Sequence, residues 1–311
     1  MVRETGFRHI INAMPDSLMQ FLERVPRLDL VLAAAIGITG LASLVSRRRG
    51  GRFREMPGWA GFWTIGAVVL MSLSHAPKYV SVPLLAIVMF AALRTYFFLA
   101  PVRPRDRYAI LASYLSIPFA LWPAYLGSQD LFLAVVPVSL FLFIPVFLAI
   151  GPPEAGMLDS MGRTLLGVLL FVFCLAHLAL LSHHELTGVL ELFGVLVLAA
   201  ELPQRLAGRF RWGSGWWIRP TIGSPISLLL TIGLGWYLGP WCGLDAGDAG
   251  RAGFLVFVAV TMGALVNDAV SKDLSLTSPS VRRGRGALLD RIVPAAYAAP
   301  VFFHYLVHFA P

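Results

Sequence analysis

Long apolar stretches alternate with short polar ones from residue 28 to the C-terminus of the chain. A helix needs about 20 mostly apolar residues to cross a bilayer. Ten stretches reach or approach that length. The expected spans are 28–45, 57–74, 79–100, 108–127, 130–150, 164–182, 186–202, 222–242, 253–270 and 288–308. The pattern therefore predicts an all-α fold, a polytopic transmembrane helical bundle of about ten spans.

The composition supports this prediction and excludes an ordinary soluble domain. Of the 311 residues, 57% are hydrophobic and 14% are charged, whereas a soluble domain has about 25% charged residues. The formal net charge of +8 does not by itself indicate nucleic-acid binding. In a membrane protein, Arg-rich loops report orientation and contact with anionic lipid. The two cysteines, Cys174 and Cys242, lack a CxxC partner, which argues against a disulfide framework.

The basic residues predict how the spans are oriented. The connections after the odd-numbered spans contain, or directly adjoin, 19 of the 25 Lys and Arg residues. The connections after the even-numbered spans contain only Lys78 and Arg251. Because cytoplasmic loops carry an excess of Lys and Arg, we expect the odd-numbered connections to be cytoplasmic and both termini to lie outside. The expected location is a bacterial inner membrane.

Three regions follow from the order of the stretches. Residues 1–27 contain an amphipathic stretch, 7–23, that predicts either an interfacial helix or a disordered leader. Residues 28–185 form a set of N-terminal membrane spans, and residues 186–311 form a C-terminal membrane region.

Three carboxylates stand at span ends that this orientation places on the cytoplasmic side. Glu201 ends the seventh span, Asp268 ends the ninth and Asp290 begins the tenth. Charges at a membrane edge are costly and need a partner or a function. Mg²⁺ is typically held by one or two carboxylates together with substrate phosphates. We therefore expect Glu201, Asp268 and Asp290 to form a suspected Mg²⁺ site.

Basic connections adjoin these carboxylates. Residues 203–220 and 271–291 together contain nine Lys and Arg residues, and such side chains bind phosphate groups. The arrangement suits a phosphorylated or nucleotide substrate that enters from the cytosol.

A purely structural interpretation accounts for the same residues. Glu201 and Arg205 are four residues apart, as are Asp268 and Lys272, and such pairs stabilise helices without any further role. Asp290 is also placed to cap the start of the last span. His177, alone in an apolar span, is interpreted as a hydrogen-bonded packing residue.

The last 120 residues contain GRGALLDRI at 284–292, QRLAGRF at 204–210 and Ser224-Pro225. In their order and content these motifs resemble the phosphatidate cytidylyltransferase family. Residues 284–292, GRGALLDRI, follow the outline of the family's terminal signature, and 294–306 resemble its closing span. Residues 204–210 are similar to the family's Gly-Arg/Lys-Phe loop, and Ser224-Pro225 stands where the family has Ser-Pro-Lys-Lys-Thr.

The chain departs from the family pattern at charged positions. Ile226 and Ser227 replace two lysines, Ala264 replaces an aspartate, and Val293 replaces another. Arg285 stands in place of the glycine-flanked histidine. The resemblance is therefore closer for the fold than for the chemical groups.

The resemblance implies an integral membrane enzyme that joins CTP and phosphatidic acid, or a related lipid phosphate, to give a CDP-lipid and pyrophosphate with Mg²⁺. It also implies membrane lipid as a partner and a possible homodimer. The catalytic residues it implies are Asp290, Asp268 and Lys272, and the residues for substrate phosphates are Arg283, Arg285, Arg291 and Ser224. Two alternatives remain open: an inactive family member that binds lipid or a membrane partner, and a transporter or flippase that uses Glu191 of the seventh span.

Overall fold

The computed structural model describes residues 27–49, 56–103, 105–150, 155–207, 218–274 and 286–310. These residues contain helices and no strand. The elements are α3 (Arg27–Arg49), α4 (Met56–His75), α5 (Lys78–Leu99), α6 (Arg107–Tyr125), α7 (Gln129–Ala149), α8 (Met157–Val168), η2 (Leu169–Cys174), α9 (Leu175–Leu181), α10 (Val189–Ala207), α11 (Ile218–Leu238), η3 (Gly239–Cys242), α12 (Ala246–Asp273) and α14 (Gly286–Phe309). Every expected span falls on one of these helices or on consecutive ones. The segment 7–23 lies outside the described residues.

Five of the helices are long and apolar enough to cross a membrane, within the described part of the chain. They are Lys78–Leu99, Gln129–Ala149, Met157–Leu181, Ala246–Asp273 and Leu288–Phe309. Helix α7 presents Phe141, Leu142 and Phe143 at its surface, each more than half exposed, as expected of a face that contacts lipid. The protein is thus an all-helical membrane protein, while the count of about ten spans and their orientation stay predictions.

Helix α12 begins seven residues before the ninth expected span. Asp245 explains the early start, because its carboxylate accepts a hydrogen bond from the Gly247 amide at 2.8 Å and so caps the helix. Asp248 lies in the first turn, where the helix dipole favours a negative charge. The connection expected between the eighth and ninth spans, 243–252, therefore contains the start of α12.

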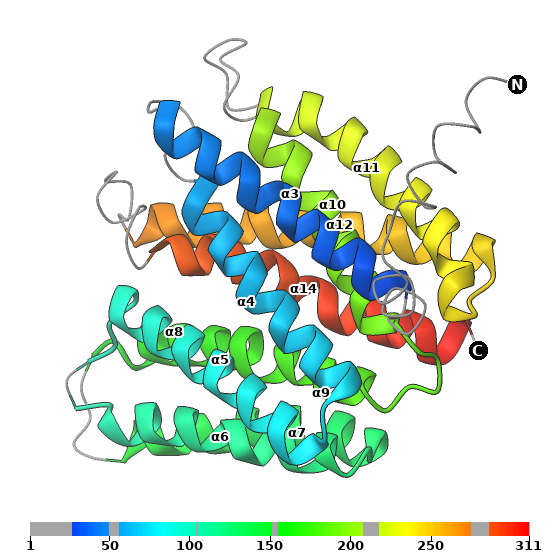
Figure 1. Ribbon diagram of the computed structural model, residues 1–311. Coiled ribbons are helices and arrows are strands. Elements are labelled where there is room, and N and C mark those ends of the chain that lie inside the picture. The colour runs from blue at the N-terminus through cyan, green and yellow to red at the C-terminus, as the bar shows by residue number, and fades with distance from the viewer. Residues whose placement is uncertain are drawn as a thin grey trace, which may run out of the picture.

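The helices form two groups that pack against each other (Figure 1). One group contains α5 to α9, and the other contains α3, α4, α10, α11, α12 and α14. Helix α14 contacts α5 and α9, and α4 contacts α5, so these helices join the groups. Because α3 and α4 also pack on α10, contacts cross the boundary between residues 185 and 186 that the order of stretches suggested.

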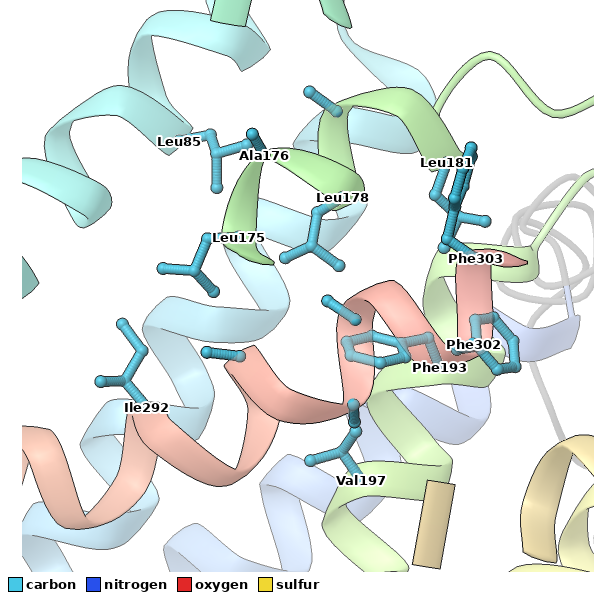
Figure 2. Close-up of a cluster of buried hydrophobic side chains, with 14 of the residues drawn as sticks. Leu85, Leu175, Ala176, Leu178, Leu181, Phe193, Val197, Ile292, Phe302 and Phe303 are labelled. Atoms are coloured by element: carbon cyan, nitrogen blue, oxygen red, sulfur yellow. The ribbon is translucent and has the colours of Figure 1, made fainter. Parts of the chain in front are cut away.

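An apolar core fills the junction between the groups. Figure 2 shows Leu175 and Leu178 of α9 facing α14. Phe302 of α14 lies beside Phe193 of α10, and Phe303 lies beside Leu181 of α9. Phe302 is fully buried, and burying a Phe side chain contributes about 1.5–3 kcal/mol. The core fixes α10 and α14 side by side, which matters for the charged residues at their ends.

Small residues bring α11 and α12 into close contact. A Cβ added at Gly235 would lie 2.3 Å from the Ala249 carbonyl oxygen, and one at Gly253 would lie 2.3 Å from the Thr231 carbonyl oxygen. Gly239 likewise approaches Ala249. Glycines at a spacing of four let two helix backbones approach closely, as in membrane helix pairs. This contact holds α11 and α12 as one unit beside α10.

Candidate functional site

Charged residues of α10 and α14 meet at the end of the bundle where the basic connections leave. Arg205 forms an ion pair with Glu201, one turn earlier on α10, with Nε to Oε2 at 3.1 Å. The Glu201 side chain is 3% exposed and that of Arg205 is 30% exposed. A second nitrogen of Arg205 donates to the main-chain oxygen of Asp290. The pair predicted by spacing is therefore present, and it also ties α10 to α14.

The ninth expected span contributes an amide to the same cluster. Asn267 of α12, which is 9% exposed, donates from Nδ2 to Asp290 Oδ1 at 2.6 Å. Glu201, Arg205, Asn267 and Asp290 thus form one connected set, called here the carboxylate network. It draws on α10, α12 and α14, and the sequence placed all three of these helix ends at one depth.

Close backbone approach positions this network. Gly263 lies one turn before Asn267, and a Cβ there would meet Pro294 Cα at 2.9 Å and the Tyr297 side chain at 3.1 Å. Gln204 Nε2 donates to Thr261 Oγ1 at 3.1 Å, which links α10 to α12. The close approach of α12 to α14 at Gly263 keeps the Asn267 amide against the Asp290 carboxylate.

The other residues that the sequence predicted for the site are not members of the carboxylate network. Asp268 is half-buried and has a partner, Lys272 is exposed, and Arg291 is half-buried and also has a partner. Arg283 and Arg285 lie outside the described residues, and so does the side chain of Ser224. Asp290 does not cap α14, because that helix begins at Gly286; the capping interpretation is wrong.

Glu201, Asp268 and Asp290 do not form a three-carboxylate group within the described residues. The group of His, Cys, Asp and Glu side chains whose ligand atoms all lie within 4.8 Å of one another consists of Asp29, His75 and Glu191. A Mg²⁺ ion that is held by one or two carboxylates plus substrate phosphates does not require such a group. Glu201 and Asp290 therefore stay candidate ligands, whereas Asp268 is not one of the four residues of the carboxylate network.

The cluster of Asp29, His75 and Glu191 is the feature that the sequence reasoning missed. Asp29 and Glu191 lie in the first turns of α3 and α10, and His75 is the last residue of α4. The sequence contained a signal for this cluster. Because neighbouring spans run in opposite directions, the starts of the first and seventh spans, with Asp29 and Glu191, are expected to lie on the same side as the end of the second span, with His75. Glu191 also lies at a helix end and not at mid-span, where a transport site was expected.

His177 has the packing role that the sequence predicted. It is fully buried, its Nδ1 lies 2.9 Å from the Phe173 carbonyl oxygen, and Phe132, Phe173 and Phe303 surround its ring edge-on. A buried histidine held in this way is part of the apolar core.

Fold and network together define a helical membrane protein with a charged cluster at one end of three packed helices. The chain is similar to the uncharacterized protein YnbB of Escherichia coli (strain K12), with 26% identity over 306 residues that cover 90% of this chain and 98% of the relative. No known protein-family profile matches the chain. No solved structure matches it.

Proposed function

We propose that this protein is a membrane-embedded nucleotidyltransferase of the cytidylyltransferase type. It would join CTP and a lipid phosphate, such as phosphatidic acid, to give a CDP-lipid and pyrophosphate. The observation that carries the proposal is the carboxylate network, which stands beside the connections 203–220 and 271–291 and their basic residues. The resemblance of residues 284–292 to the terminal signature of that family gives the chemistry.

The reaction needs groups that the network and its neighbours contain. A phosphate oxygen of the lipid attacks the α-phosphorus of CTP, and the bond from that phosphorus to the bridging β-phosphate oxygen breaks. Catalysis of phosphoryl transfer is mostly positioning and neutralisation of charge. Asp290 and Glu201 are the candidate Mg²⁺ ligands, and the ion would neutralise the departing pyrophosphate.

Basic side chains would hold the remaining phosphate charge. Arg291 follows Asp290 directly, and Lys272 is exposed at the end of α12. Arg283 and Arg285 of the same connection are proposed for the same task from the sequence alone. Arg205 already contacts both Glu201 and Asp290, so its role is to position the two acidic residues.

The test is a direct assay of the purified protein in detergent micelles. Radiolabelled CTP, Mg²⁺ and phosphatidic acid are supplied, and labelled CDP-lipid is separated from CTP after extraction. We expect product with the wild type and a loss of at least about 100-fold with Asp290→Asn, since one lost stabilising group at a reacting centre commonly costs 10²–10³ in rate. Asp273→Asn is the matched control, because Asp273 is exposed at the end of α12.

The assay also has a clear negative result. If the wild type makes no more CDP-lipid than Asp290→Asn, with phosphatidic acid and with a polyprenyl phosphate, then the proposed activity is refuted. Equal loss in Asp273→Asn would show that the effect of Asp290→Asn is not specific to the network.

One observation favours a second function, lipid binding without catalysis. The ion pair of Glu201 with Arg205 and the hydrogen bond of Asn267 to Asp290 already engage one oxygen of each carboxylate that a catalyst would present to its metal ion and substrate. Replacement of the family's charged residues by Ile226, Ala264 or Val293 points the same way. If the protein only binds lipid, the assay should yield no CDP-lipid, and the purified protein should retain phosphatidic acid.

A further inference from the structure

A second cluster of polar side chains lies at the opposite end of α10 from the carboxylate network. Glu191 and Glu201 are ten residues apart on this helix, which corresponds to about 15 Å along its axis. The cluster contains Asp29 of α3, His75 of α4 and Glu191 of α10. By the distribution of basic residues, this end faces away from the cytoplasm.

Buried carboxylate oxygens that accept no hydrogen bond from the described chain make this cluster unusual. Glu191 is fully buried, and neither of its carboxylate oxygens accepts a hydrogen bond of normal geometry within the described residues, although Ser74 lies beside it. Asp29 is 4% exposed, and its Oδ1 likewise has no hydrogen-bond partner there. A buried carboxylate without compensation is costly, so these two groups call for a positive charge.

His75 supplies a ligand atom between the two carboxylates. Its Nε2 lies 3.0 Å from Asp29 Oδ2 and 3.6 Å from Glu191 Oε1. Ligands bound at about 2.0–2.1 Å to one tetrahedral zinc ion lie about 3.3 Å apart, and the distances from His75 to the two carboxylates fall on either side of that value. The three ligand atoms all lie within 4.8 Å of one another.

The surrounding packing holds the three residues in place. Gly188, just before α10, has a φ of +82°, and an added Cβ would lie 2.8 Å from Leu28 Cδ1 of α3. One turn into α10, a Cβ at Gly194 would lie 2.7 Å from Leu70 Cδ1 of α4. These glycines allow α3, α4 and α10 to approach closely, which brings a ligand from each helix together.

A simpler explanation of the cluster is an ion triad without a metal, in which a protonated His75 lies between the carboxylates of Asp29 and Glu191. Asp29 and Glu191 would also be favoured by the positive helix N-termini on which they lie, and His75 by the negative C-terminus of α4. This arrangement leaves the cluster with a net negative charge in a buried place. In this arrangement His75 Nε2 stays 3.6 Å from Glu191 Oε1, which is too far for a hydrogen bond. A bound cation would contact the Glu191 carboxylate directly.

We propose that Asp29, His75 and Glu191 bind one divalent transition-metal ion of the Zn²⁺ class. An imidazole nitrogen together with carboxylate oxygens suits Zn²⁺ better than Mg²⁺, which prefers oxygen ligands. The side chain of His75 is 47% exposed, so the ion has a route in from the surface. Three protein ligands leave a fourth position for water, as in zinc sites that are not purely structural.

The test measures zinc binding to the full-length protein, without a polyhistidine tag, in detergent. The protein is stripped with a chelator, incubated with Zn²⁺ and desalted, and bound zinc is determined by mass spectrometry and by titration calorimetry. We expect one zinc ion per chain for the wild type. Glu191→Gln and His75→Gln should each weaken binding by at least about 100-fold, since loss of even an outer-shell partner costs 10–100-fold.

Controls separate this site from other residues that could bind zinc. Glu185→Gln removes an exposed carboxylate from the same end of the bundle, and His183→Gln removes a nearby histidine; both should bind zinc as the wild type does. Zn²⁺ should raise the unfolding temperature of the wild type and of these controls, but not that of Glu191→Gln or His75→Gln.

Two results would overturn the proposal. The first is a wild type that retains no zinc after desalting, which leaves the ion triad as the explanation. The second is full stoichiometry and affinity in His75→Gln or Glu191→Gln. Gel filtration and far-ultraviolet circular dichroism establish that each variant is folded, and if Glu191→Gln does not fold, the half-exposed His75→Gln still decides the question.

Discussion

The close backbone contact between α11 and α12 gives the sharpest prediction about stability. Gly253 of α12 faces the backbone of α11, where an added Cβ would lie 2.3 Å from the Thr231 carbonyl oxygen and 2.8 Å from its carbonyl carbon. Both atoms belong to the main chain, so no rotamer change can relieve the clash. Gly253→Ala must therefore push α11 and α12 apart.

Gly250 offers a matched comparison on the same helix. A Cβ there would lie 3.8 Å from the Trp236 Cβ, which is ordinary van der Waals contact. Both substitutions exchange Gly for Ala inside α12, so the gain in helix propensity, about 0.8–1.0 kcal/mol, is the same for each. The difference between Gly253→Ala and Gly250→Ala therefore isolates the steric cost.

The expected size of that cost follows from the distances. An oxygen at 2.3 Å must move by roughly 1 Å to reach the ordinary contact range that begins at 3.4 Å. Overpacking of this kind costs about 1–3 kcal/mol. At about 2–4 °C per kcal/mol for chains of a few hundred residues, Gly253→Ala should unfold roughly 2–12 °C below Gly250→Ala.

Thermal unfolding in detergent measures this difference. Cys242 is buried and Cys174 is half-buried, and neither forms a disulfide within the described chain, so a thiol-reactive fluorophore reports when the bundle opens. Gly250→Ala should unfold at or slightly above the temperature of the wild type. If Gly253→Ala unfolds at the same temperature as Gly250→Ala, the close contact of α11 and α12 is not a constraint and the reasoning is refuted.

Three further predictions concern polar contacts. Asn267→Ala removes the donor to Asp290 Oδ1 and should destabilise the protein by about 1–3 kcal/mol, which lowers its unfolding temperature. An unchanged unfolding temperature would contradict the role of the carboxylate network in joining α12 to α14. Tyr96→Phe removes a hydrogen bond to a main-chain carbonyl of α8 at 2.9 Å and should cost about 0.5–1.5 kcal/mol in the same assay, whereas no loss would show that the bond is not needed. Burial acts to raise the pKa of Asp106, but hydrogen bonds, chiefly from Arg103, outweigh it and hold that pKa below its ordinary value of 3.8. Asp106 therefore stabilises the folded state fully above about pH 4 and loses this effect as the pH falls through its lowered pKa. The difference in unfolding temperature between the wild type and Asp106→Asn should shrink below about pH 4. A difference that stays constant with pH would contradict this role of Asp106.

The positions of the helices could be predicted because long apolar runs leave little choice. In lipid, every backbone amide and carbonyl must be satisfied within the segment, so each such run becomes a helix. The boundaries were less certain where polar caps decide them. Asp245 starts α12 within a stretch that resembled a loop, since a single side-chain hydrogen bond to Gly247 is enough to extend the helix.

The candidate site was predictable in its depth but not in its contacts. Alternating spans and basic connections placed Glu201, Asp268 and Asp290 at one end of the bundle. Which side chains meet depends on the rotation of each helix about its axis, and close packing at Gly263 sets that rotation for α12. As a result Asn267, and not its neighbour Asp268, donates to Asp290.

The sequence by itself determined the helical membrane fold and the polar residues at the ends of its spans, because burial in lipid acts on each segment separately. Only the tertiary structure decided which of those residues form a cluster. Asp29, His75 and Glu191 are separated by 46 and 116 positions in the sequence, and they meet because α3, α4 and α10 pack together through small residues such as Gly194. Contacts between distant segments depend on side-chain shape on both sides, which the apolar pattern of a single span does not contain.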